Sequence, residues 1–197
     1  MNKIKIHRKS AFTLAELMVG LTLGVMVLAG VLAAYIFFCR TGVAIAQYYD
    51  MEDESRTTMQ VFGQDVRQAK AINWGSVSSM TLTLPDNSTV IYAYDAGTNS
   101  FKRTKAISGV TSTFTLASGI DSFAFKAYSA LNLNISNGPA EISLDSVADS
   151  VAARTAANTN TSMVRIQIVL RRNASSQVYS TAQAITAAYA LRNKIGI

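Results

Sequence analysis

A carboxylate in an unusual setting lies near the start of the chain, between a basic leader and a long apolar run. Glu16 is the only charged residue between Phe12 and Cys39, and a carboxylate at the start of a membrane-spanning helix is costly unless it is paired. If the chain is cut after Ala11, Phe12 gains a free amino group, and Glu16 lies four residues further on the same helical face. The spacing therefore predicts an amine–carboxylate pair in an apolar setting.

Two segments surround this pair, a basic leader and a membrane helix. Residues 1–11 contain no acidic side chain and four basic ones, Lys3, Lys5, Arg8 and Lys9. From Leu17 to Cys39 there are 23 consecutive uncharged residues, which as a helix would measure about 35 Å at about 1.5 Å per residue, enough to cross a bilayer. Basic residues beside a first apolar segment stay in the cytoplasm, so we expect the rest of the chain outside.

Two simpler interpretations compete for this segment. An ordinary secretory signal has an apolar core of about 7–15 residues, shorter than this one, although the small residues before Ala34 would suit a signal peptidase. A plain signal anchor explains the length and the charges, but it gives Glu16 no partner.

The string Phe-Thr-Leu-x-Glu, followed by more than twenty apolar residues, resembles the cleavage and methylation motif of type IV prepilins and type II secretion pseudopilins. The resemblance implies that a prepilin peptidase cuts between Ala11 and Phe12 and methylates the new amine, which gives N-methylphenylalanine. It also implies that Glu16 neutralises such an amine, commonly that of a neighbouring subunit, as helices pack into a filament.

The chain departs from the family pattern at two points. The family usually has Gly before the cut, where this chain has Ala11. Many major pilins also have a proline about twenty residues into the mature chain, and this helix has none. Its flexible points would be Gly20, Gly24, Gly30 and Gly42, which could equally allow close helix packing in the membrane.

Composition argues against several other functions. Four of the 18 basic side chains lie in the leader, so the mature chain would carry 14 against 12 acidic ones, too balanced to favour nucleic acid as a partner. His7, the only histidine, lies in the leader, which leaves no imidazole for catalysis or metal binding. Cys39, the only cysteine, is interpreted as a small apolar helix residue rather than a site of interchain disulfide formation or lipidation. We expect no enzyme, cofactor or metal site.

Beyond the membrane segment the apolar residues recur every three or four positions up to Ile72, which predicts an amphipathic helix continuous with the first. The string Asn73-Trp74-Gly75 is expected to end it. The acidic cluster at residues 50–54 is either a docking patch or a solvated helix face. The pair Tyr48-Tyr49 is either an interfacial anchor or part of the core.

After Gly75 alternating apolar and polar residues predict β-strands. We expect a three-stranded meander over residues 80–84, 90–94 and 100–104, then strands at 120–128, at 163–170 and within 178–191. Residues 171–176 are expected to form a turn, and residues 129–161 a long loop with a short helix near 145–154. The basic string at residues 101–105 is either a nucleic-acid stripe or a solvated strand.

The sequence thus predicts an α+β fold, a long helix packed on an antiparallel sheet, similar to the pilin plan. Its expected segments are a leader (1–11), a transmembrane and filament-core helix (12–40), an amphipathic half-helix (41–74) and a β-sheet head (75–197). The layout and the string Ala-Leu-Arg-Asn at residues 190–193 most resemble PilW-type minor pilins and J-type minor pseudopilins.

The expected function is a structural subunit of a type IV pilus or a type II secretion pseudopilus. Its partners would be prepilin peptidase, other pilins or pseudopilins through helix packing, and the bacterial inner membrane before assembly. The N-terminus would be cytoplasmic and the head periplasmic, and the subunit would then enter a periplasmic or cell-surface filament. The alternative is a signal-anchored extracytoplasmic binding domain that never enters a filament.

Overall fold

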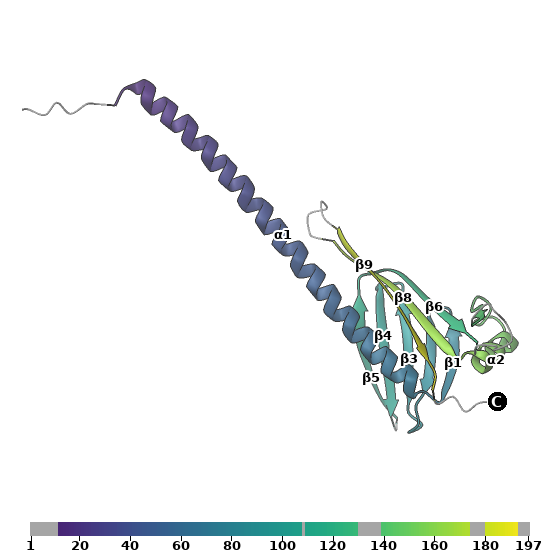
Figure 1. The fold of residues 1–197 in the computed structure, drawn as a ribbon. Helices are drawn as coiled ribbons and strands as arrows, with labels where there is room; N and C mark the ends of the chain where they lie inside the picture. The colour runs from purple at the N-terminus through teal and green to yellow at the C-terminus, as the bar shows by residue number, and fades with distance from the viewer. Residues whose placement is uncertain (1–11, 108, 130–138, 174–179, 193–197) are drawn as a thin grey trace, which may run out of the picture. The chain divides into compact units, whose positions relative to one another are not determined.

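The structure is a computed structural model that describes residues 12–107, 109–129, 139–173 and 180–192 (Figure 1). The chain divides into two compact units, one up to Ile45 and one from Ala46 onward. A single helix, α1 (Leu14–Gln68), belongs to both units. The predicted segment limits at residues 11, 40 and 74 stay predictions.

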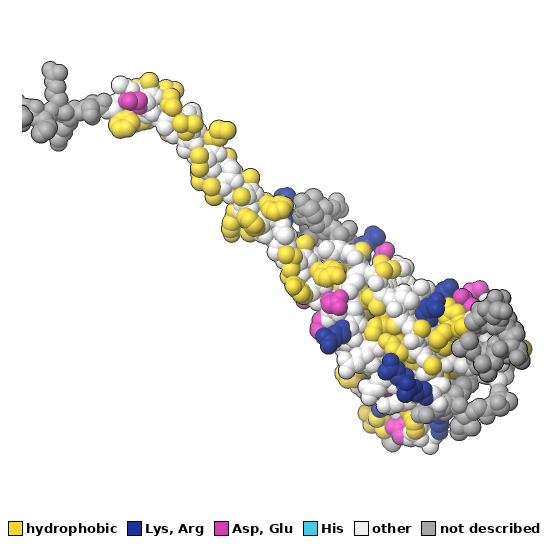
Figure 2. All heavy atoms as spheres, in the orientation of Figure 1, with side chains coloured by type: hydrophobic (Ala, Val, Ile, Leu, Met, Phe, Trp, Pro, Cys, Tyr) yellow, Lys and Arg dark blue, Asp and Glu magenta, His cyan; other side chains and the backbone are white. Residues whose placement is uncertain are grey.

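The first unit consists, within the described residues, of the apolar part of α1. Its large side chains are exposed, with Leu17 61% and Phe38 71% accessible, and Figure 2 shows them covering this part of the helix. Among the described helices, α1 alone is long and apolar enough to cross a membrane. Cys39 is exposed on it.

The helix ends earlier than the sequence predicts. It stops at Gln68, and Ala71–Ser76 form strand β1 instead of the last helical turn and its stop signal. Ile72 and Trp74 are buried and lie two residues apart, which is the spacing of side chains on one face of a strand. The apolar residues before them have the three- and four-residue spacing of a helix. Pairing of β1 with the next strand decides between the two periods.

Five strands, rather than the three predicted, form the first antiparallel sheet. In sequence and in space they run β1, β2 (Ser79–Thr83), β3 (Thr89–Asp95), β4 (Ser100–Ile107) and β5 (Val110–Ser118). β1 and β5 were not predicted from the sequence. β5 is rich in Ser and Thr and is exposed on both faces over its first six residues, and its alternation of polar and apolar residues is confined to residues 113–116, which makes a weak signal.

The second sheet has the order β7-β6-β8-β9. Its strands are β6 (Ile120–Tyr128), β7 (Glu141–Ile142), β8 (Met163–Asn173) and β9 (Ser180–Ala190). The predicted strands at 120–128 and within 178–191 are confirmed. The turn predicted from Arg171 is wrong at its start, because β8 continues to Asn173 paired with β9; residues 174–176 lie outside the described ones.

The predicted loop at 129–161 contains β7 and a helix, α2 (Val151–Asn160), six residues later than expected. Ser150 caps it by accepting a hydrogen bond from the backbone N–H of Ala153. α2 covers the outer edge of β1: the Trp74 backbone N–H donates to Asn158 Oδ1 at 2.7 Å, and its indole N–H donates to Thr161 at 3.0 Å.

The core of the second unit forms where α1 meets both sheets. Phe62, on α1, has its ring centroid 5.1 Å from Tyr92 of β3, 6.4 Å from Phe101 of β4, 6.0 Å from Phe125 of β6 and 5.7 Å from Tyr189 of β9. One helical side chain thus contacts four strands. The predicted α+β class is confirmed.

Gly63 makes this packing fit, and it supports a first prediction. A Cβ on Gly63 would overlap the Tyr189 ring, with Cζ only 2.8 Å away. We expect Gly63→Ala to lower the free energy of unfolding by about 1–3 kcal/mol, measured by urea denaturation of the full chain in detergent micelles. Gly42→Ala is the control, because nothing lies within 4 Å of its Cβ position. An equally stable Gly63→Ala would contradict the packing argument.

Candidate assembly site

The first turn of α1 is closed by a reciprocal pair of residues. Thr13 precedes the helix, and its side-chain oxygen accepts a hydrogen bond from the Glu16 backbone N–H at 3.3 Å. In return Glu16 Oε2 accepts from the Thr13 backbone N–H at 2.9 Å and from the Thr13 hydroxyl at 2.8 Å. This is a capping box, which satisfies helix-end donors that otherwise have no partner.

The capping box places two of the three predicted site residues within one helical turn. Phe12 is 81% exposed directly before Thr13, and Glu16 lies in the first turn. Ala11, the residue predicted to precede the cut, lies outside the described residues. The capping role of Thr13 was not predicted from the sequence, although the Thr-x-x-Glu spacing was a sufficient signal.

A second set of polar residues fixes α1 to the first sheet. Asp65, on the buried face of the helix, accepts on Oδ2 from the Tyr92 hydroxyl at 2.6 Å and from Arg103 Nε at 2.8 Å. Burial, and then the neighbouring Asp65 carboxylate, raise the pKa of Tyr92 well above its usual range. Burial lowers the pKa of Arg103, but the hydrogen bond and charge of Asp65 outweigh it, so that pKa is raised overall.

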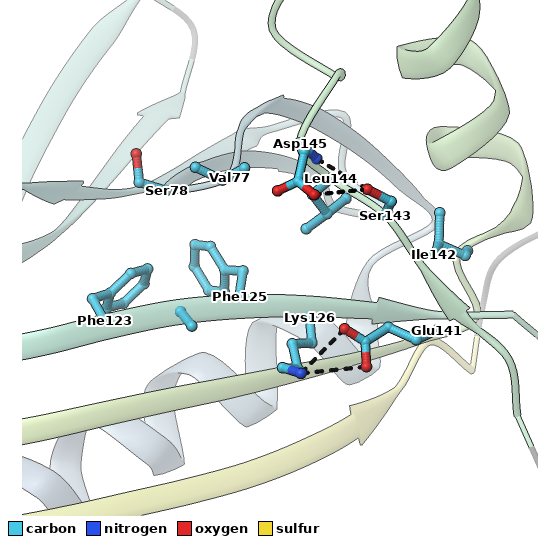
Figure 3. Close-up of a pocket in the computed structure, with 11 residues that line it drawn as sticks. Val77, Ser78, Phe123, Phe125, Lys126, Glu141, Ile142, Ser143, Leu144 and Asp145 are labelled. Atoms are coloured by element: carbon cyan, nitrogen blue, oxygen red, sulfur yellow. Dashed lines mark hydrogen bonds and ion pairs between the residues drawn. The ribbon is translucent and has the colours of Figure 1, made fainter.

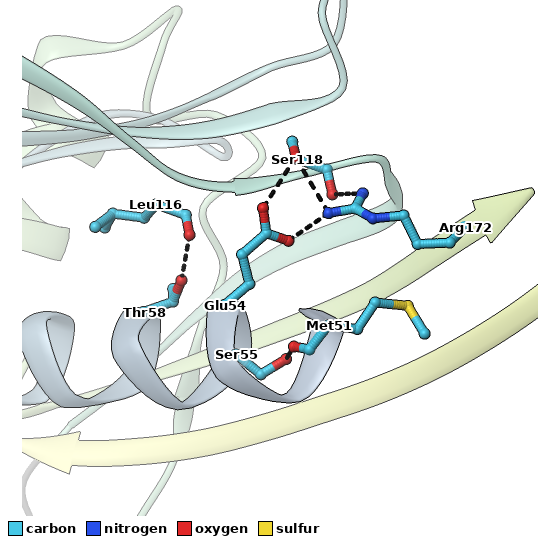
Figure 4. Close-up of polar contacts among 7 residues, drawn as sticks. All are labelled: Met51, Glu54, Ser55, Thr58, Leu116, Ser118 and Arg172. Atoms are coloured by element: carbon cyan, nitrogen blue, oxygen red, sulfur yellow. Dashed lines mark hydrogen bonds and ion pairs between the residues drawn. The ribbon is translucent and has the colours of Figure 1, made fainter. Parts of the chain in front are cut away.

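A third set ties the helix to both sheets at once (Figure 4). Glu54 accepts from Arg172 of β8 at 2.5 Å and from the Ser118 hydroxyl of β5 at 3.0 Å, and Arg172 also donates to the Ser118 carbonyl at 2.5 Å. One turn on, Thr58 donates to the Leu116 carbonyl at 2.9 Å. The acidic cluster is therefore divided: Glu54 binds the head, whereas Asp53 is exposed.

The other two open questions about the second unit have structural answers. The basic string on β4 is no continuous stripe, because Arg103 turns to Asp65 while Lys102 pairs with Asp95 at 2.8 Å. Tyr48 and Tyr49 are 49% and 69% exposed, so neither belongs to the core.

The head also contains a cavity of about 440 Å³ between the β1–β2 turn, β6 and the segment after β7 (Figure 3). Phe123 and Phe125 face Val77 across it, while the ion pair of Lys126 with Glu141, at 3.1 Å, lies on the other side of β6. Within the described ranges, no three His, Cys, Asp or Glu side chains gather closely enough to hold a metal. The cavity offers shape, but no constellation of reactive groups.

Comparison with known proteins bears on the N-terminal segment. Residues 6–32 match the family described as the prokaryotic N-terminal methylation motif. The motif indicates a type IV pilin-like or pseudopilin-like precursor. The match spans Ala11, the capping box and much of the exposed apolar helix, and it implies processing by prepilin peptidase. This family is structural, and the apolar helix supports membrane anchoring. No curated protein matches the chain significantly.

The buried ion pair leads to a second prediction. Arg103→Met leaves the Asp65 carboxylate buried with only the Tyr92 hydroxyl, so we expect a loss of about 3–5 kcal/mol in the free energy of unfolding. Lys102→Met, on the same strand, breaks a pair that is more than a third solvent-accessible and should cost less than about 1 kcal/mol. Denaturant titration of both full-length variants measures the difference. Equal losses in the free energy of unfolding for the two variants would show that the buried Asp65 carboxylate does not depend on a neighbouring cation.

The raised pKa of Tyr92 leads to a third prediction. Because the folded protein holds the phenol neutral above its ordinary pKa of 10.0, its contribution to stability is complete below that pH and is lost as pH rises further. Stability should therefore fall above pH 10.0 by up to about 1.4 kcal/mol per pH unit from this group alone. Tyr92→Phe should remove that part of the slope. Identical slopes in denaturant titrations between pH 9 and about 11 would contradict it.

Proposed function

We propose that the protein is a minor pilin or pseudopilin, a structural subunit of a type IV pilus or a type II secretion pseudopilus. The observation that carries the proposal is the methylation motif over residues 6–32, which includes the first turn of an exposed apolar helix. In this role the chain is a substrate and a building block, and it is not an enzyme.

The proposed maturation changes charge at one point. Water adds across the Ala11–Phe12 peptide bond, which releases the leader and leaves a protonated amine on Phe12. Methylation then needs a sulfonium methyl donor: the amine loses one proton to solvent, its nitrogen takes the methyl group as the donor's carbon–sulfur bond breaks, and the donor leaves as a thioether. The methylated amine keeps its positive charge. The apolar surface of the first unit is covered by lipid before assembly and by the helices of neighbouring subunits afterward.

The capping box suggests how Glu16 receives its partner. Thr13 contacts only Oε2, so Oε1 is left to accept from the Phe12 amine of a neighbouring subunit. The two charges would then enter the apolar filament core as a hydrogen-bonded pair, the form in which buried charges are tolerated. Loss of either partner leaves an uncompensated charge.

Cleavage is the first test of this function. We expect the N-terminal peptide of the membrane-expressed full chain to begin at N-methyl-Phe12 in cells with a prepilin peptidase, and at Met1 in cells without one, as read by mass spectrometry. A leader that stays intact in both would instead indicate an anchored extracytoplasmic domain. A start at Ala34 would indicate a secreted protein.

Assembly is tested separately with Glu16→Gln. We expect this variant to be cleaved normally and to fall at least roughly tenfold in the sheared filament fraction, because a buried amine without its carboxylate costs several kcal/mol. Asp53→Asn is the matched control, since it also removes one carboxylate from α1 but at an exposed position of the second unit. Normal incorporation of Glu16→Gln would refute the pairing mechanism.

A further inference from the structure

The edges of the two sheets are protected unequally. The outer edge of β1 is covered by α2, and the last strand of the same sheet, β5, is bound by Thr58 from α1. Thr58 reaches β5 only at Leu116, near the end of that strand. β9 is the longest edge strand among the described residues: it has 11 residues, and no described strand pairs with it on the side away from β8. An open edge of this length is a template for another strand.

The direction of the free backbone groups follows from the register. Leu191 donates its backbone N–H to the Ser162 carbonyl at 2.9 Å, in line with the pairing of Met163 with Ala190. In an antiparallel pair, hydrogen-bonded and non-hydrogen-bonded positions alternate. The odd-numbered residues of β9 therefore bond to β8, and the N–H and C=O groups of the even-numbered residues point away from the sheet.

The side chains of β9 do nothing to block pairing. The strand has no charge, no proline and no irregularity in its register with β8, the usual devices that protect an edge. Its even-numbered side chains are small and exposed: Ala182, Ala184, Thr186, Ala188 and Ala190. In Figure 2 hydrophobic side chains gather on the visible face of the head over β8 and β9.

Beside this edge lies a groove on the helix. It has a volume of about 420 Å³ and is lined by Met59, Gln60, Gly63, Gln64, Arg67, Gln68 and Tyr189. Tyr189 of β9 forms one wall, donating its hydroxyl to the Met59 carbonyl at 2.9 Å, and the Arg67 guanidinium lies 5.3 Å from the centre of its ring. The lining is rich in amides and has one positive charge, from Arg67.

We propose that β9 and this groove form a docking site for an extended strand of a different filament subunit, which extends the second sheet across the subunit boundary. On the face that continues the alanines of β9, the docking strand would have small, neutral side chains. On the face toward the groove, it would have side chains that form hydrogen bonds, with an acidic one opposite Arg67. The proposal rests on the proposed function in one respect only, namely that the docking strand comes from a filament subunit.

Substitutions at Ala184, in the middle of β9, test the edge. Lysine there places a charge at the docking site without breaking a bond to β8, and proline removes an outward N–H only. We expect Ala184→Lys and Ala184→Pro to be cleaved as wild type and to fall at least tenfold in the filament fraction. Ala184→Ser, which keeps the N–H and the size, should assemble normally.

A control on the sheet face separates edge pairing from face docking. Ala124 of β6 lines a hollow of about 320 Å³ on the same face as Ala184, but β8 lies between it and the open edge. Ala124→Lys should therefore assemble as wild type. Loss of assembly in both lysine variants, or in neither, would overturn the proposal.

Hydrogen exchange of the full chain measures the pairing directly. In the detergent-solubilised protein the even-numbered amides of β9 should exchange quickly and the odd-numbered ones slowly. In filaments the even-numbered amides should slow at least tenfold. A wild-type chain that is never cleaved refutes the proposed function, whereas a chain that assembles with its even-numbered amides still fast refutes only the docking site.

A photo-crosslinking residue at position 184 identifies the donor in assembled filaments. An adduct with an alternating, uncharged strand of a different subunit supports the proposal. An adduct with β9 of a second copy overturns the assigned donor.

Discussion

The charge of Asp65 sets the position of the helix in the head. A buried carboxylate is stable only beside its donors, and those donors, Tyr92 and Arg103, lie on two neighbouring strands. Turning α1 by one residue, about 100°, would point Asp65 away from both. With that rotation fixed, Phe62 reaches four strands, Gly63 lies under Tyr189 and Glu54 meets Arg172. The aromatic core provides the packing area between α1 and the strands, and Asp65 fixes the rotation of α1 about its axis.

The carboxylates near the two ends of α1, Glu16 and Asp65, differ in where their partners come from. Asp65 has its partners within the same chain, so this carboxylate is paired before any assembly. Among the described residues, Glu16 is held by its neighbour Thr13, in a contact that caps the helix and brings no opposite charge. In the proposed filament the missing charge comes from another subunit. One helix thus combines a self-sufficient end with an end that depends on a partner.

Local signals in the sequence predicted much of this structure, and contacts between distant residues account for what was missed. The apolar run and the strand at 120–128 followed from periodicity and length. β1 was missed because Ile72 continues the three- and four-residue spacing of the helix and is drawn into a strand only by pairing with β2. β5 was missed because Val110, Phe114 and Leu116 are its only large apolar residues among serines and threonines. Asp65 could not be assigned a partner, because its donors are 27 and 38 residues away. At the N-terminus Glu16 was singled out, but its bond to Thr13 was overlooked, and cleavage after Ala11 stays a prediction.

The polar contacts of α1 also determine how the head would bear a mechanical load. Glu54, Thr58 and Asp65 are spread along three turns of the helix, and each binds across to a strand. A force along the helix axis would stretch these contacts at the same moment, in shear, whereas a force that peeled the helix away would break them one after another. Within the head, the helix is therefore best suited to tension along its own axis and least suited to peeling.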